Sequence, residues 1–181
     1  MYKIIIDILL FILDWTWCFP QTVIGRVLSC GWKNILAPAN DADLLWIKRK
    51  EKEWRCKIYL VKKESRDKHW FWQKVSGFGC GRYICLTEAE PDNGEIDDLE
   101  NVKHEHGHII FSRITGPFFM LLCGIPSPAG NLINRWQAKH KGWTWEQLVT
   151  WYYNQPWEKC ADILGGVDRT KWIKERVYDP E

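Results

Sequence analysis

Two long apolar stretches, residues 1–30 and residues 114–134, set the strongest limit on how this chain folds. Such stretches must be buried against protein or in lipid, because water solvates them poorly. Neither has the sequence of a plain membrane-spanning helix. Asp7 and Asp14 interrupt the first, and each aspartate at the centre of a span costs about 2.5–3.5 kcal/mol. The second carries no charge, but prolines and glycines break it.

The polar residues of the first stretch follow a helical period. Lys3, Asp7, Asp14 and Gln21 are four and then seven residues apart, so in a helix they form one narrow stripe. Pro20 is expected to end or kink that helix. The pattern fits a buried core helix, or a helix that lies in or on a bilayer with its stripe turned to protein or headgroups. We favour the second interpretation. No small-residue cleavage site of a signal peptide follows the stretch, so we expect the segment to remain in the mature protein.

The second stretch points the same way. Its breakers predict a short helix around residues 118–123 that dips into the membrane interface, rather than a continuous span. The predicted partner is therefore a membrane lipid surface, and the predicted location is membrane-associated. The breakers are Gly116, Pro117, Gly124, Pro126, Pro128 and Gly130.

The fold class predicted from the remaining pattern is α+β. The 181 residues suit a single domain over 1–181, with an apolar segment at 1–30, a sheet and helix at 46–115, and further helices at 116–181. Alternation predicts a strand over 54–61, and two more are expected at 69–75 and 82–87.

The simplest arrangement of these strands is an antiparallel meander. In it the glycines Gly77, Gly79 and Gly81 would lie in the turn before the third strand. We expect this small antiparallel sheet to pack on a helix over 97–116 that Asp97 or Asp98 caps.

Charge and cysteine content narrow the class of partner and compartment. A net charge of +2 gives no reason to expect nucleic acid. The basic run 48–68 and the acidic run 88–100 are typical of solvated loops, although the basic run is also suited to anionic headgroups. The seven cysteines include no CxxC pair, which favours free thiols on the reducing, cytoplasmic side of a membrane.

One motif carries chemistry. His104, Glu105 and His108 form an HExxH sequence on the predicted helix, and residues four apart share a face. The two imidazoles can bind one zinc ion at about 2.0–2.1 Å. Glu105 can then accept a proton from a water that the ion polarises. The middle residue, His106, is expected to point elsewhere.

A third protein ligand is expected on a later helix. Thr144 and Gln147 predict a capping box, and Pro156 predicts the start of a further helix. On that helix Glu158 is the expected third ligand, and Asp162, one turn on, is expected to hold a ligating histidine in its tautomer. The alternatives are that Asp162 is itself the ligand, or that Glu158 is an ordinary surface glutamate.

The HExxH motif at 104–108, followed by ExxxD at 158–162, resembles the gluzincin arrangement of zinc metallopeptidases. The chain also resembles small uncharacterised bacterial membrane-associated proteins with an HEYGH-type motif. The first resemblance implies zinc bound by His104, His108 and Glu158, a general base at Glu105, and Asp162 behind the ligands. The sequence departs from that family at Trp157, where many members have asparagine, and it offers only Tyr152, Tyr153 and Tyr178 as phenols near the motifs.

The function predicted from the sequence is a membrane-associated zinc-dependent hydrolase, and specifically a metallopeptidase acting on a peptide or protein substrate. A strand edge near residues 83–87 is expected to pair with that substrate. The alternative is a non-catalytic binding or scaffold protein that zinc stabilises. A third possibility is a metal-free module at the membrane surface.

Overall fold

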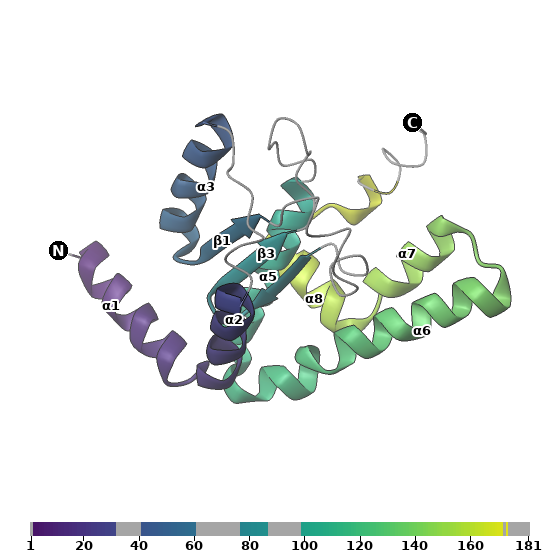
Figure 1. Ribbon diagram of the computed structural model, residues 1–181, viewed down its shortest axis with the longest axis horizontal. Coiled ribbons are helices and arrows are strands. Elements are labelled where there is room, and N and C mark those ends of the chain that lie inside the picture. Colours follow the sequence, from purple (N-terminus) through teal and green to yellow (C-terminus); the bar gives the residue numbers. More distant parts are fainter. Residues whose placement is uncertain (1, 32–40, 61–76, 87–98, 172, 174–181) are drawn as a thin grey trace.

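The computed structural model describes residues 2–31, 41–60, 77–86, 99–171 and 173, and within them it shows an α+β fold in which helices surround a small sheet (Figure 1). The elements at the N-terminal side are α1 (Tyr2–Trp15), α2 (Phe19–Gly31), α3 (Asp41–Trp54), β1 (Lys57–Leu60), β2 (Gly77–Cys80) and β3 (Tyr83–Leu86). They are followed by α5 (Leu99–Thr115), η2 (Gly116–Phe118), η3 (Met120–Gly124), α6 (Pro126–Lys141), α7 (Trp145–Tyr153) and α8 (Pro156–Gly165).

The sheet is mixed, so the predicted antiparallel meander is wrong. Its strand order is β1-β3-β2, in which β1 runs parallel to β3 and β2 runs antiparallel to β3. Two parallel strands need a connection that brings the chain back to the end of the sheet where the first strand began. No local sequence pattern predicts such a connection. Residues 83–86 of the segment expected to offer an edge form the central strand β3. The strand expected at 69–75 lies outside the described residues.

Two glycines that were expected in a turn lie in β2, where α5 packs directly on the strand. A Cβ at Gly79 would lie 2.3 Å from the backbone oxygen of Glu105, and one at Gly77 would lie 3.1 Å from Glu105 Oε1. Any side chain at Gly79 would therefore separate the strand from the helix. Gly81, with φ of 63°, makes the turn into β3.

The hydrophobic core lies between α3, the sheet and α5. The strand predicted over 54–61 begins later than expected, because Trp54 ends α3 and β1 starts at Lys57. Within β1 the predicted alternation is confirmed, since Ile58 and Leu60 are buried while Lys57 is exposed. Two tryptophans of α3, Trp46 and Trp54, pack against this core from one side. The buried core residues are Ile47, Cys56, Ile58, Leu60, Ile84, Leu86, Val102 and Ile109.

The N-terminal stretch forms two helices instead of one. Pro20 lies in the first turn of α2, where its missing N–H group costs nothing, so it begins a helix where it was expected to end one. Gln21 consequently leaves the predicted stripe and is buried, donating from its amide to Ser112 Oγ and to the Gly116 carbonyl. Asp14, at the end of α1, is also buried and accepts two hydrogen bonds from Arg113 of α5, at 3.0 and 3.1 Å.

The segment after the metal-motif helix differs from the single short helix predicted over 118–123. It consists of the 3₁₀ turn η2 and the π-helical turn η3, which lead into α6. Gly116 has φ of 55°, and a Cβ there would collide with the ring of Trp17. Glycine at this position therefore lets α5 end against α2.

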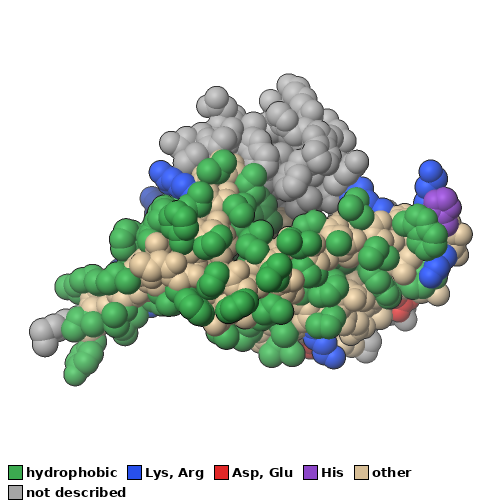
Figure 2. All heavy atoms as spheres, turned by 90° about the horizontal axis from the view of Figure 1, so that it is seen from below, with side chains coloured by type: hydrophobic (Ala, Val, Ile, Leu, Met, Phe, Trp, Pro, Cys, Tyr) green, Lys and Arg blue, Asp and Glu red, His purple; other side chains and the backbone are tan. Residues whose placement is uncertain are grey.

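A broad apolar surface extends across the face shown in Figure 2, from α1 to α6. Among the described helices none is by itself long and apolar enough to cross a membrane. Two bent pairs meet the length and composition criteria together, α1 with α2 at 89° and α5–η2 with η3–α6 at 117°. Exposed apolar residues of these elements include Ile4, Ile8, Leu9, Phe11, Phe19, Val27, Phe118, Leu121, Ile125, Leu132 and Trp136.

Candidate metal centre

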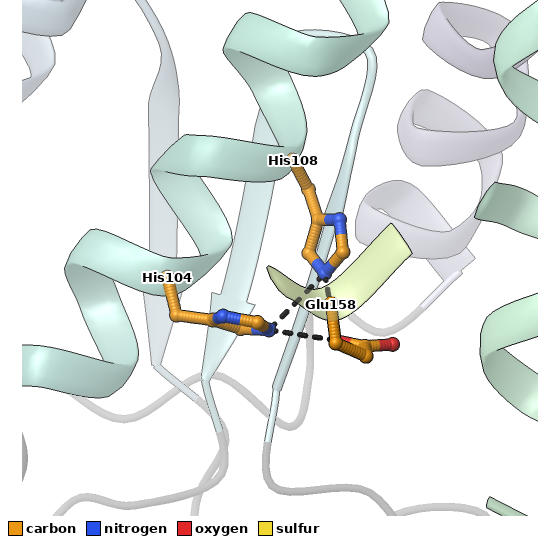
Figure 3. Close-up of side chains that lie close together, drawn as sticks. All are labelled: His104, His108 and Glu158. Atoms are coloured by element: carbon orange, nitrogen blue, oxygen red, sulfur yellow. Dashed lines mark hydrogen bonds and ion pairs between the residues drawn. The ribbon is translucent and has the colours of Figure 1, made fainter. Parts of the chain in front are cut away.

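Two histidines of α5 and one glutamate of α8 meet inside the protein. His104 and His108 lie one helical turn apart, and with Glu158 all three are buried. The two Nε2 atoms are 3.2 Å apart. Glu158 Oε2 lies 2.9 Å from the Nε2 atom of His104 and 3.3 Å from that of His108. Figure 3 shows the three side chains pointing toward one another.

Glycines bring the two helices close enough for this meeting. A Cβ at Gly107, inside the HExxH motif, would lie 1.9 Å from the backbone oxygen of Ala161 in α8. A Cβ at Gly165 would lie 2.2 Å from the backbone oxygen of Lys103 in α5. The helices therefore touch backbone to backbone, which no larger residue would permit. The short side chain of Glu158 reaches the histidines because of this contact.

The local sequence signals for α7 and α8 are confirmed. Thr144 and Gln147 form the predicted capping box. Pro156 lies in the first turn of α8, and Gly166 ends the helix with φ of 71°. These boundaries place residues 158 and 162 one turn apart on the buried face of α8.

Asp162 holds the other ring nitrogen of His104. His104 Nδ1 lies 2.7 Å from Asp162 Oδ1. Because a carboxylate accepts a hydrogen bond from Nδ1–H, the neutral ring carries its lone pair on Nε2, the atom that faces Glu158. Arg169 in turn donates to both carboxylate oxygens of Asp162 and stacks over the ring of Tyr153 at 3.7 Å. The structure thus gives Asp162 the position expected for it, behind a histidine and away from the three converging atoms.

Cys123 plays the corresponding part for His108, and the sequence analysis missed it. Its Sγ atom lies 3.2 Å from His108 Nδ1, and the thiol is buried and free. The π-helical turn η3 brings it there. Turns of this kind are frequent at functional sites. A cysteine in an uncharged stretch is usually a core residue, so its own sequence context did not indicate a contact with His108. The glycines and prolines around it were the only local sign of an irregular helix.

The three converging atoms fit a metal ion. One ligand atom from each of the three side chains lies within 4.8 Å of the others. Ligand atoms about 2.0–2.1 Å from a tetrahedral zinc ion are about 3.3–3.4 Å apart, close to the separations seen here. Acceptor atoms that face one another in a buried place repel unless a proton or a metal ion lies between them. The group could therefore hold a metal ion.

The pKa values show the same attraction for positive charge. Burial lowers the pKa of His104, but its hydrogen bonds to Asp162 and Glu158 outweigh burial and raise the pKa above the ordinary value. Contacts with Cys123 and Glu158 do the same for the pKa of His108. Burial raises the pKa of Glu158, but the two histidines hold it well below its ordinary value.

Glu105 is not among the three residues whose ligand atoms converge. It is buried, and its Oε2 atom has no hydrogen-bond partner among the described residues. Burial raises the pKa of Glu105, and the nearby histidines partly offset the rise. A buried carboxylate without a partner is costly to keep, and such groups are found where a ligand or a proton is handled.

The tyrosines and the middle histidine that the sequence pointed to lie around the three converging side chains or point away from them. The Tyr152 hydroxyl lies 3.0 Å from Ser127 Oγ, and the ring of Tyr153 meets His104 edge-on at 5.2 Å. Tyr178 lies outside the described residues. His106 turns away, as expected, and stacks on Trp54 at 4.2 Å. Burial, with Arg113 nearby, lowers the pKa of His106 to about 4, so the ring is neutral and packs as a hydrophobic side chain.

No family model, curated protein or solved structure matches this chain.

Proposed function

We propose that this protein is a membrane-associated zinc-dependent hydrolase of the gluzincin-like kind, and specifically a metallopeptidase. The observation that supports this most is the convergence of His104, His108 and Glu158 on one point, near a buried Glu105 whose Oε2 atom has no hydrogen-bond partner among the described residues. Two imidazoles and a carboxylate are a common ligand set of catalytic zinc and leave a coordination position open. The proposed packing of α5, α8 and the sheet is zincin-like.

The residues of the chain have separate tasks in this proposal. A zinc ion, when bound, supplies a Lewis acid that polarises a carbonyl and acidifies water. Asp162 and Cys123 fix the ring orientations of the histidines that hold it. Glu105 accepts a proton from water at its carboxylate and passes that proton to the leaving amine, and its raised pKa suits both steps near neutral pH.

The strand next to the centre is β2, and we propose that it carries the extended substrate in place of the segment 83–87. Within the described sheet β2 is an edge strand, and it runs along α5 with Gly79 against Glu105. An edge strand offers backbone donors and acceptors to a peptide. A peptide paired there would lie beside the proposed general base.

The apolar surface supports membrane attachment as the second part of the proposal. Exposed apolar side chains from α1, α2, η3 and α6 share the face in Figure 2. Contiguous surfaces of this kind are typical of interfaces with lipid or protein. We place the protein on the reducing, cytoplasmic side because of its free thiols.

The catalytic proposal is tested with Glu105→Gln. We expect the variant to retain zinc and to lose hydrolysis of a mixed peptide substrate by about 10²–10⁴-fold, because it cannot accept a proton. Zinc content by mass spectrometry and initial rates measure the two effects. Glu100→Gln is the matched control, since Glu100 lies on the same helix and pairs with Lys103 instead. Unchanged turnover in Glu105→Gln rejects the role of Glu105.

A zinc-stabilised scaffold without catalysis is the second candidate, and the backbone contact between α5 and α8 favours it. An ion between these helices would lock them together. In that case His104→Ala lowers the melting temperature sharply, while Glu105→Gln has no effect on any function of the protein.

A further inference from the structure

A cleft far from the metal centre opens between α1 and α3. Its volume is about 730 Å³. Lys3, Asp7 and Asp14 line it from α1, so these three members of the predicted polar stripe do share one side of the helix. The apolar side chains Leu10 and Phe11 of the same helix complete that wall.

Every carboxylate in the cleft already has a cationic partner. Two of the four pairs use residues that are outside the lining, Lys50 and Arg113. The carboxylates therefore cancel little of the positive charge of the cleft itself. The four pairs are Asp7–Arg55, Asp14–Arg113, Glu51–Lys57 and Glu53–Lys50.

An excess of cations remains. Lys3, Lys48, Arg49 and Lys52 line the cleft, are exposed, and pair with no carboxylate among the described residues. A fifth cation, Arg82, lies over the ring of Phe11 at 5.9 Å. Cations gathered this closely repel one another, and an anion among them relieves the repulsion.

The surface beside the cleft is apolar. The side of α1 opposite the cleft exposes Ile5, Leu9 and Ile12, and the apolar surface continues across the face in Figure 2. A ligand that binds here thus meets cations on one side of α1 and an apolar surface on the other. A phospholipid combines an anionic phosphate with acyl chains in that order.

We infer that the cleft between α1 and α3 binds the phosphate headgroup of an anionic phospholipid, with the acyl chains along the exposed side of α1. The inference rests on the membrane attachment proposed above and is independent of the metal centre. The headgroup contacts are Lys48, Arg49 and Lys52. Asp7 and Asp14 position α1 through their pairs with Arg55 and Arg113.

The test measures binding of the full-length protein to vesicles of phosphatidylcholine alone and of phosphatidylcholine with phosphatidylglycerol. The double variant Arg49→Gln, Lys52→Gln is compared with Lys139→Gln, Lys141→Gln, which removes the same charge from the end of α6. At about 1 kcal/mol per well-placed cation, the cleft variant is expected to bind anionic vesicles about 30-fold more weakly. The control is expected to change binding by less than about threefold.

The outcomes separate this inference from the proposed function. Equal loss in both variants indicates a general surface charge and overturns the headgroup site. Unchanged binding to both vesicles in the cleft variant also overturns it but leaves membrane attachment standing. Wild-type protein that binds neither vesicle rejects the attachment itself. Zinc content and far-UV circular dichroism of each variant show whether the fold and the metal centre are intact.

Soluble anions test the other sources of the same chemistry. Inorganic phosphate at about 10 mM is expected to leave the protein on anionic vesicles, because it lacks acyl chains. If phosphate releases the protein fully, or if a short single-stranded RNA binds the wild type and not the cleft variant while vesicles do not distinguish them, the lipid assignment is wrong.

Discussion

Charged residues gather in two regions of this molecule, and the two differ in burial. Between α5 and α8, His104, His108 and Glu158 are buried and contact one another within 3.3 Å. Between α1 and α3 the cations are exposed and outnumber the carboxylates that they face. The first region depends on fixed distances, because buried charges without close partners are costly. The second depends on summed charge in water, which tolerates movement.

The largest expected effect is from Gly107→Ala. The added methyl group would meet the backbone of Ala161, so α8 must move away from α5. We expect a loss of about 1–3 kcal/mol in the free energy of unfolding, together with loss of bound zinc. Chemical denaturation and metal analysis measure both.

Gly130→Ala is the matched control for that substitution. A Cβ at this helical position makes only ordinary contacts, the nearest at 3.4 Å. Removing a glycine from a helix is expected to stabilise the protein by about 0.5–1 kcal/mol. If both substitutions raised the free energy of unfolding, α5 and α8 would not be in backbone contact.

The next effect is the pH dependence of the metal-free protein. The pKa of His104 is raised from 6.5 to about 9, so its contacts stabilise the fold fully below about pH 6.5 and are lost as the pH rises through 9. The melting temperature of chelator-treated protein should therefore fall between those pH values, while that of zinc-loaded protein should not. Parallel curves would contradict a shared site for protons and metal.

Asp162→Asn and Cys123→Ala are expected to weaken zinc binding by smaller and graded amounts. Asp162 accepts a charge-assisted hydrogen bond from His104, and loss of such support costs about 10–100-fold in metal affinity. The thiol of Cys123 is a weak partner of His108, so its loss should cost less. Competition with a chromophoric chelator measures both affinities. A larger loss of zinc affinity in Cys123→Ala than in Asp162→Asn would contradict this expected order.

The smallest effect is expected in the open cleft. Asp7→Asn breaks the pair with Arg55. The side chain of Asp7 is 58% exposed in that pair. Exposed pairs contribute about 0–1 kcal/mol, so the melting temperature should hardly change. A loss as large as that of Gly107→Ala would mean that the cleft is as rigid as the metal centre.

Local patterns predicted the parts of the centre that a single helix determines. His104 and His108 share a face because they are four residues apart, and the capping box and Pro156 predicted where α7 and α8 begin. The meeting of α5 and α8 was expected only from the chemistry of the residues. Its physical cause, the glycine contact at Gly107, concerns the space between two helices and leaves no mark in either helix alone.

Features that depend on distant segments were missed. The parallel pairing of β1 with β3 follows from the path of the chain between them, and residue alternation is the same in both sheet types. Cys123 reaches His108 from a segment whose composition indicated only a lipid contact. Pro20 was expected to end a helix, but proline is equally suited to the first turn of a helix.

The contact between the main chains of α5 and α8 also bears on which ion the protein selects. Main-chain atoms cannot adopt another rotamer, so the spacing of the two helices that carry the three ligand atoms would not adjust to the size of an ion. Small ions that prefer about 2.0–2.1 Å to nitrogen match it, whereas Ca²⁺, at about 2.3–2.6 Å and with six to eight oxygen ligands, is too large and lacks its donors. In the proposed metal centre, selectivity would thus depend on the distance between two helix axes as much as on the ligands themselves.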